Sequence, residues 1–211
     1  MCRIAGIVDR SISIDSIEPL VKEMCQILKD GGPDDEGVYC DPKNHLVLGH
    51  RRLSIIDLSA SGHQPMSYSG QRYWVSYNGE LYNYPELKSE LKQQGCQFSN
   101  TSDTEVILAA FATWGTAAFK RFNGMYALAL WDALEGSIYL ARDSSGIKPL
   151  YYAITKEGLS FASEIRAFAP IPWLQQEQPH WPVYLMAYGH LPEPITTLKE
   201  VKPLGKGSWL K

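Results

Sequence analysis

The sequence lacks the features that mark exported, membrane-spanning and zinc-binding proteins. It has four cysteines among 211 residues, none of them in a Cys-x-x-Cys pair, and no Cys/His cluster with the spacing of a zinc site. No apolar run is long enough to span a bilayer, and charged residues interrupt the N-terminal stretch where a signal peptide would need an apolar core. We therefore expect a reduced, cytoplasmic protein with no structural metal and no membrane contact.

An excess of positive charge is also missing. The formal net charge is -3, with 20 Lys and Arg residues against 23 Asp and Glu residues. Such a chain has no basic field to attract nucleic acid or an anionic membrane, so we expect neither as a partner. What is present is an ordinary globular composition, 45% hydrophobic and 20% charged. The length suits one large domain or two small ones.

The order of predicted elements favours an α+β fold. An apolar, β-branched strand covers 2–8, and a helix with apolar residues at helical spacing runs from Ser16 until Gly31-Gly32-Pro33 ends it. Alternating patterns between turn residues predict further strands at 45–49, 53–58, 73–77, 125–131, 137–142, 150–154 and 159–161. The parallel strand-helix-strand alternation is absent, so we expect largely antiparallel sheets.

Three local signals refine this pattern. The strand at 73–77 is predicted to end in a turn at Asn78-Gly79. Two helices follow at 85–94 and 103–114, and the second should begin with a capping box in which Ser102 is the cap and Glu105 its partner. The proline-rich stretch at 170–194 is predicted to be irregular.

The N-terminus raises a chemical question. Cys2 directly follows Met1, and removal of Met1 would leave a thiol and a free amine on the same residue. The thiolate is a strong nucleophile, and an α-amine, with a pKa of about 7.7 to 8.0, can serve as its base. A lone cysteine is more often a small buried hydrophobic residue, and Cys2 alone favours that interpretation.

Three polar stretches, at 50–57, 77–83 and 102–108, supply further parts of an amide hydrolase. Taken singly, Arg52 is a strand-end charge, Asn78-Gly79 a turn, and Asp103 an acid at a helix N-terminus. Taken together, Asn78-Gly79 would donate hydrogen bonds to an oxyanion and Arg52 would bind a carboxylate through two bonds. Asp103 or Glu80 would then bind an ammonium group. The combination suits an amide of an α-amino acid.

Sequence blocks along nearly the whole chain resemble those of a known protein family. They are Cys2 with the blocks HRRLSIIDLSASGHQPM, YNGELYNYPEL, SDTEVIL, FNGMYALALWD, LARDSSGIKPLYY, FASEIRAF and LPEPITTLKEVKPL. In this order the blocks resemble the class II, N-terminal-nucleophile glutamine amidotransferase domain of asparagine synthetases. GHQPM and LPEPIT favour this branch over the related amidotransferases of purine or glucosamine synthesis.

The resemblance implies a fold and a set of site residues. The fold is the N-terminal nucleophile hydrolase fold, a four-layer αββα sandwich with two mainly antiparallel sheets, formed by one amidotransferase domain at 1–211. The implied catalytic residues are Cys2, exposed by removal of Met1, with Asn78 and Gly79 as the oxyanion hole. The implied substrate-binding residues are Arg52 for the glutamine carboxylate, Ile55 and Ile56 in the pocket wall, Asn78 and Gly79, and Glu80 and Asp103 for the α-amine.

The implied activity is hydrolysis of glutamine through a Cys2 thioester, with release of ammonia. A synthetase domain, in cis or in trans, would use the ammonia. The Ser-Gly-Gly-Leu-Asp-Ser loop of that domain does not occur in this sequence, so ATP and magnesium are expected only for the synthetase domain. The amidotransferase domain itself should need no cofactor and no metal. The oligomeric state is left open, with a homodimer as one alternative.

Two positions depart from the family pattern. Arg3 stands where the family has glycine or another small residue, and Gly31 replaces the arginine of a His-Arg-Gly-Pro-Asp motif. Because neighbouring residues of a strand point to opposite faces, we expect Arg3 not to reach the space at Gly31. Arg3 should have its own acidic or carbonyl partner, and the pocket should be more open at Gly31. Because of these departures, a second interpretation stays open. In it, the domain has the same fold but is catalytically weakened and serves regulation or assembly.

Overall fold

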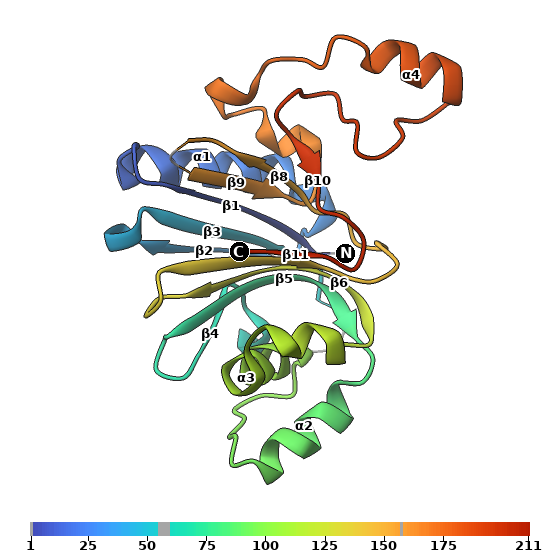
Figure 1. Ribbon diagram of the computed structural model, residues 1–211. Coiled ribbons are helices and arrows are strands. Elements are labelled where there is room, and N and C mark those ends of the chain that lie inside the picture. Colours follow the sequence, from blue (N-terminus) through green and yellow to red (C-terminus); the bar gives the residue numbers. More distant parts are fainter. Residues whose placement is uncertain (1, 55–59, 157) are drawn as a thin grey trace.

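Four layers build the structure, a computed structural model that describes residues 2–54, 60–156 and 158–211. Helix α1 (Ile14–Ile27) covers the outer face of one sheet, and helix α3 (Asp103–Trp114) covers the outer face of a second sheet, with helix α2 (Tyr84–Gln93) packed against α3. The two sheets face each other between these helical layers (Figure 1). The arrangement confirms the predicted α+β sandwich.

The first sheet has six strands in the order β10-β8-β9-β1-β3-β2, and its named pairs are antiparallel. Its strands are β1 (Arg3–Asp9), β2 (Asp35–Asp41), β3 (Leu46–Arg52), β8 (Tyr151–Ile154), β9 (Gly158–Ala162) and β10 (Lys202–Pro203). Strand β1 pairs with β3 on one side and with β9 on the other. Cys2, which precedes β1, therefore lies at the end of a central strand rather than at a sheet edge.

The second sheet has five strands in the order β11-β7-β6-β5-β4, again with antiparallel pairs. Its strands are β4 (Met66–Tyr68), β5 (Tyr73–Leu81), β6 (Gly124–Asp132), β7 (Ser137–Arg142) and β11 (Trp209–Leu210). The nine-residue strands β5 and β6 pair along their whole length, from Tyr73 opposite Asp132 to Leu81 opposite Gly124. This long ladder is the rigid element on which one half of the site is built.

Apolar residues fill the spaces between all four layers. Alternation along the strands sends one set of side chains toward the helices and the other toward the opposite sheet. Helix α1 buries Ile17, Val21, Met24 and Cys25 against the first sheet. The layer between the sheets contains Ile4, Leu46, Leu48, Ala127, Ala129, Trp131, Ile138, Leu140, Leu150, Phe161 and Leu204.

The predicted turn at Asn78-Gly79 is wrong, because both residues lie inside β5. Gly79 pairs with Tyr126 of β6, and a side chain at position 79 would overlap the Met125 carbonyl oxygen. The φ angle of Gly79 is not in the left-handed region. Glycine is therefore required here by the close approach of the neighbouring strand, and not by a turn.

Helix α3 has the predicted bounds, but only half of the predicted capping box forms. The Ser102 hydroxyl accepts a hydrogen bond from the Thr104 N–H at 3.1 Å. Glu105 does not reach back to Ser102; its carboxylate accepts bonds from the Ser99 N–H, the Ser99 hydroxyl and the Asn100 N–H. Glu105 thus anchors the loop before the helix rather than the cap residue.

Other parts of the chain were missed by pattern reasoning. The proline-rich stretch contains helix α4 (Trp181–Tyr188), and β2, β4, β10 and β11 were not predicted. Leu53 and Ser54 follow β3 outside any strand, and the rest of the strand predicted at 53–58 lies outside the described residues. None of the helices in the described ranges combines the length and the apolar character needed to cross a membrane.

Glu105→Ala should destabilise the domain by about 1 to 3 kcal/mol, because it leaves backbone donors of Ser99 and Asn100 without their acceptor. Urea unfolding followed by circular dichroism measures the loss. Glu86→Ala, an exposed change in the first turn of α2, is the matched control and should stay within about 0.5 kcal/mol. Equal midpoints for the two variants would contradict the anchoring role of Glu105.

Candidate active site

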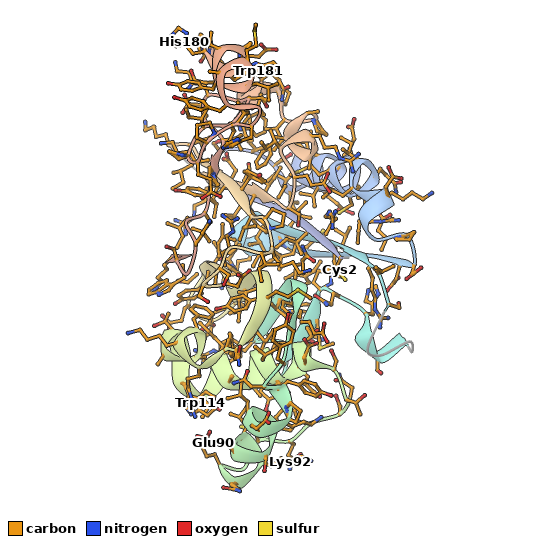
Figure 2. All side chains as sticks on the ribbon, turned by 90° about the vertical axis from the view of Figure 1, so that its right-hand side faces the viewer. Cys2, Glu90, Lys92, Trp114, His180 and Trp181 are labelled. Carbon is orange, nitrogen blue, oxygen red and sulfur yellow. The ribbon has the colours of Figure 1, made fainter. Side chains whose placement is uncertain are left out.

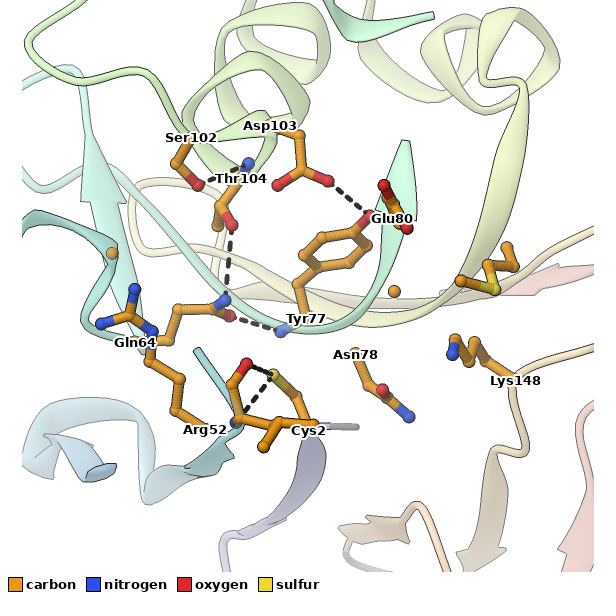
Figure 3. Close-up of a pocket in the computed structure, with 14 residues that line it drawn as sticks. Cys2, Arg52, Gln64, Tyr77, Asn78, Glu80, Ser102, Asp103, Thr104 and Lys148 are labelled. Carbon is orange, nitrogen blue, oxygen red and sulfur yellow. Dashed lines mark hydrogen bonds between the residues drawn. The ribbon is translucent and has the colours of Figure 1, made fainter. Parts of the chain in front are cut away.

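A pocket lies where the start of β1 meets strand β5 and the N-terminus of α3 (Figure 3). Its volume is about 80 Å³. Figure 2 places Cys2 about midway along the molecule, far from His180 and Trp181 at the start of α4. The described lining residues are Cys2, Arg52, Leu53, Gly62, Gln64, Tyr77, Asn78, Gly79, Glu80, Ser102, Asp103, Thr104, Met125 and Lys148.

The structure brings together six of the eight residues predicted for the site. Cys2 comes from the start of β1, Arg52 from the end of β3, and Asp103 from the first turn of α3. Asn78, Gly79 and Glu80 follow one another along β5. The two remaining predictions, Ile55 and Ile56, lie outside the described residues.

The Cys2 thiol is held by one neighbouring residue. It donates to the Leu53 carbonyl at 3.6 Å and accepts from the Leu53 N–H at 3.4 Å. Burial raises the pKa of the thiol above its ordinary value, although the bond with Leu53 acts in the opposite direction. The thiol is therefore protonated at neutral pH, and a reaction at sulfur needs a base that removes its proton at the moment of attack.

Asn78 has an unusual environment for a buried amide. Its side chain lies in the pocket close to Cys2 (Figure 3), and the residue is 1% exposed. Neither its Oδ1 nor its Nδ2 has a hydrogen-bond partner among the described residues. A buried amide without partners is costly, and most buried polar groups avoid this state. The amide of Asn78 is thus available for a ligand bound beside the thiol.

Asp103 is the buried anion of the pocket. As the first residue of α3 it lies at the positive end of the helix dipole, where a carboxylate is favoured. Its Oδ2 accepts hydrogen bonds from the Tyr77 hydroxyl and the Leu81 N–H, both at 2.9 Å. Burial nevertheless raises the pKa of Asp103 above its usual value, because the two bonds only partly offset the loss of solvent.

Arg52 is a buried cation on another side of the pocket from Asp103 (Figure 3). A side chain at Gly62, in the short 3-10 turn Ala60–Gly62, would overlap its guanidinium group. Glycine at position 62 therefore leaves the space that this group occupies. The pocket has a fixed cation on one wall and a fixed anion on another, which is the arrangement that a zwitterionic amino acid requires.

Pattern reasoning missed Gln64, Thr104, Tyr77 and Lys148 as pocket residues. Gln64 accepts from the Tyr77 N–H at 2.7 Å and donates to the Thr104 hydroxyl at 3.3 Å, so it joins β5 to α3. Its only signal was its place in the GHQPM block. Lys148 is 1% exposed, and burial lowers the pKa of its ammonium group. A lysine within the apolar segment GIKPLYY was the available signal for it.

His50 is buried but is not among the described residues that line the pocket. Its Nε2 lies 3.0 Å from the Tyr77 carbonyl oxygen, which can only accept, so this nitrogen carries the proton. Burial lowers the pKa of His50 to about 4, and the ring is neutral at physiological pH. The bond joins β3 of the first sheet to β5 of the second. This geometry supports a structural role for His50.

The two departures from the family pattern meet in space. Arg3 has the expected acidic partner, because its Nε pairs with Glu164. The expectation that Arg3 cannot reach the space at Gly31 is wrong: a Cβ on Gly31 would lie 2.7 Å from Cγ, Nε and Cζ of Arg3. The long arginine side chain folds across the neighbouring turn, which strand alternation alone did not predict. The space beside Gly31 is therefore filled rather than open.

Residues 1–211 match the glutamine amidotransferase domain family. The chain belongs to this family. Curated relatives of this amidotransferase domain include asparagine synthetase [glutamine-hydrolyzing] 1 of Bacillus subtilis, 37% identical over 99% of this chain and 33% of its own length. Asparagine synthetase B of Escherichia coli is 36% identical over 81% of this chain and 30% of its length. The chain thus spans about a third of the relatives that it matches.

Solved structures support the fold. Glutamine phosphoribosylpyrophosphate amidotransferase from B. subtilis superposes with a TM-score of 0.66 at 20% identity, over 80% of this chain and 43% of that chain. A structure described as the allosteric regulatory enzyme of purine biosynthesis gives a TM-score of 0.68 at 21% identity, over the same shares. The sandwich of this amidotransferase domain is therefore the N-terminal nucleophile hydrolase fold that the sequence blocks implied.

Tyr77→Phe should raise the pKa of Asp103 further, because it removes one of the two hydrogen bonds that stabilise the ionised carboxylate. A carbon-detected NMR titration of the aspartate carboxyl groups measures the shift, with Asp103→Asn to assign the signal. Tyr82→Phe, a change at an exposed tyrosine, is the matched control. An unchanged pKa in Tyr77→Phe would show that burial alone sets the titration of Asp103.

Proposed function

We propose that this amidotransferase domain hydrolyses glutamine to glutamate and ammonia, as the glutaminase part of an asparagine synthetase, with Cys2 as the nucleophile. The observation that carries the proposal is the unpartnered, buried amide of Asn78 beside the Cys2 thiol. A hydrogen-bond donor held ready in a water-poor site is what an oxyanion hole provides. The match to the amidotransferase family and to glutamine-hydrolysing synthetases supports the same function.

The proposed reaction begins after Met1 has been removed. The α-amine of Cys2 takes the thiol proton while Sγ attacks the side-chain amide carbon of glutamine. The oxygen of the tetrahedral intermediate accepts hydrogen bonds from the Asn78 amide and the Gly79 N–H. The C–N bond then breaks, and the departing nitrogen receives the proton from the α-amine and leaves as ammonia. Water, deprotonated by the same amine, hydrolyses the thioester and releases glutamate.

The proposed substrate recognition uses the two fixed charges of the pocket. Arg52 binds the α-carboxylate of glutamine through its planar guanidinium group, and Asp103 with Glu80 binds the α-ammonium group. Only the ionised form of Asp103 attracts the ammonium group. Since burial raises the pKa of Asp103, glutamine binding should weaken as the pH falls through that raised value, and it should be fully present above it.

The proposed partner is a synthetase domain, in cis or in trans, that passes the ammonia to an aspartyl-adenylate formed with ATP and magnesium. Helix α4 supports such a partner, because none of its residues is buried and its apolar side chains face solvent. Met186 is 88% exposed and Val183 is 63% exposed. Exposed apolar residues in a row are typical of a protein contact surface.

All four cysteines are free thiols, which fits the proposed cytoplasmic location.

Activity should depend on a free amine at Cys2, because nucleophile and base belong to the same residue. Protein whose intact mass shows that Met1 is retained, and Cys2→Ala, should both release glutamate at background rate. Protein with Met1 removed should be active, and its kcat/KM should fall as the α-amine becomes protonated below a pKa of about 7.7 to 8.0. Equal turnover with and without Met1 would exclude the amine as the base.

Asn78→Ala should lower kcat by roughly 100- to 1,000-fold, as loss of an oxyanion donor does, with a small change in KM. The Asn78 amide has no hydrogen-bond partner among the described residues. The substitution therefore breaks no hydrogen bond within the described part of the protein, and the melting temperature should not fall for that reason. Arg52→Ala provides the contrast: loss of a charged hydrogen-bond donor should raise KM by about 10- to 100-fold. Steady-state glutamate release measures both, and an exchanged pattern would mean that the two roles are exchanged.

A further inference from the structure

The residue that follows Cys2 contacts the backbone of Cys2. Arg3 donates from Nη1 to the Cys2 carbonyl oxygen at 3.1 Å, while its Nε pairs with Glu164. Glu164 also accepts from Nε of Arg166 at 2.6 Å. Burial acts to raise the pKa of Glu164, but the bonds from Arg3 and Arg166 outweigh it and hold the pKa below its usual range. An ionised carboxylate therefore holds the Arg3 guanidinium in place at neutral pH.

Gly31 completes this arrangement by leaving room for it. Any Cβ at position 31 would lie 2.7 Å from three atoms of Arg3, which is closer than real Cβ contacts come. The φ angle of Gly31 is not in the left-handed region, so the backbone of the turn does not itself require glycine. The absence of a side chain at position 31 is thus explained by the space that Arg3 occupies, and not by backbone conformation.

A nucleophile at the N-terminus needs positioning more than one inside a chain. Once Met1 is removed, Cys2 is joined to the protein on one side only, and it precedes the first residue that pairs in β1. Its thiol is held by Leu53 and its carbonyl by Arg3. The carbonyl carbon is bonded to Cα, which carries the amine directly and the thiol through Cβ. Fixing the carbonyl oxygen therefore limits rotation about the Cα–C bond and sets the directions in which the amine and the Cβ atom leave Cα.

We propose that Arg3 is a positioning residue for the Cys2 nucleophile. Glu164 holds the Arg3 side chain in place, and glycine at position 31 leaves the space that this side chain occupies. The proposal rests on the glutaminase function proposed above. Arg3 is not among the described residues that line the pocket, and its contact with the Cys2 carbonyl is the route by which it acts on the chemical step. It should affect kcat and leave glutamine binding nearly unchanged.

Five variants test this role by steady-state glutamate release, with melting temperatures to correct for folded protein. Arg3→Ala should lower kcat by about 10- to 100-fold, the effect of a small misplacement of a reacting group, while KM changes by less than about threefold. Gly31→Ala should lower kcat in the same way with Arg3 still present, because the new Cβ displaces the guanidinium group. Combined with Arg3→Ala, it should add little, since both act on one contact.

The fourth variant is the matched control. Arg166→Ala removes the other arginine on Glu164 but leaves the contact between Arg3 and Cys2, so its kcat should stay within about twofold of wild type. An exchange variant, Arg3→Gly with Gly31→Arg, returns one guanidinium group to the shared space. It should recover most of the kcat that Arg3→Ala loses. A structural role for Arg3 alone would instead lower the melting temperature and leave kcat per folded molecule unchanged.

The outcomes separate the two proposals. Wild-type protein with Met1 removed that releases no more glutamate than Cys2→Ala would overturn the glutaminase function, and the role of Arg3 with it. An active wild type with unchanged kcat in both Arg3→Ala and Gly31→Ala would overturn the role of Arg3 alone. If Arg3→Ala does not fold, Gly31→Ala carries the test, because its change lies in a short, partly exposed turn.

Discussion

Packing of the two sheets against each other fixes where the thiol and the oxyanion donor lie. Cys2 directly precedes β1 of the first sheet and Asn78 lies in β5 of the second, and no strand pair joins the two sheets in the described ranges. Buried polar bonds join them instead, from His50 to the Tyr77 carbonyl and from the Ser76 hydroxyl to the Gly49 carbonyl. The apolar layer sets the separation of the sheets, and these directional bonds set their relative position.

Much of the fold could be predicted because local patterns and tertiary packing agree. Helix α3 starts at a serine cap and is apolar on nearly every side, and its predicted bounds are those observed. Asn78-Gly79 shows the opposite case, because a dipeptide typical of turns is used inside a strand where β6 approaches closely. Helix α4 escaped prediction because Pro182 and Pro192 suggest irregular structure, whereas proline is well tolerated in the first turn of a helix.

The site was predicted through family resemblance more than through residue chemistry. Each of Arg52, Asp103 and Asn78 has an ordinary explanation when it is taken singly, and only their meeting in one pocket distinguishes them. Gln64 and Lys148 were missed because a sequence does not reveal which polar residues become buried. Asn78 also shows that the native state retains an unfavourable group: among the described residues its buried amide has no partner, which lowers stability, and the proposed oxyanion role accounts for it.

The shared space of Arg3 and Gly31 limits the order in which the two positions can change during evolution. From the family pattern, with a small residue at 3 and arginine at 31, a single substitution gives either two arginines that compete for one space or none at all. Position 3 and position 31 are therefore coupled although they lie 28 positions apart in this chain. A residue chosen at either position alone therefore fixes what the other can be, and in this chain the pair leaves one guanidinium group beside the nucleophile.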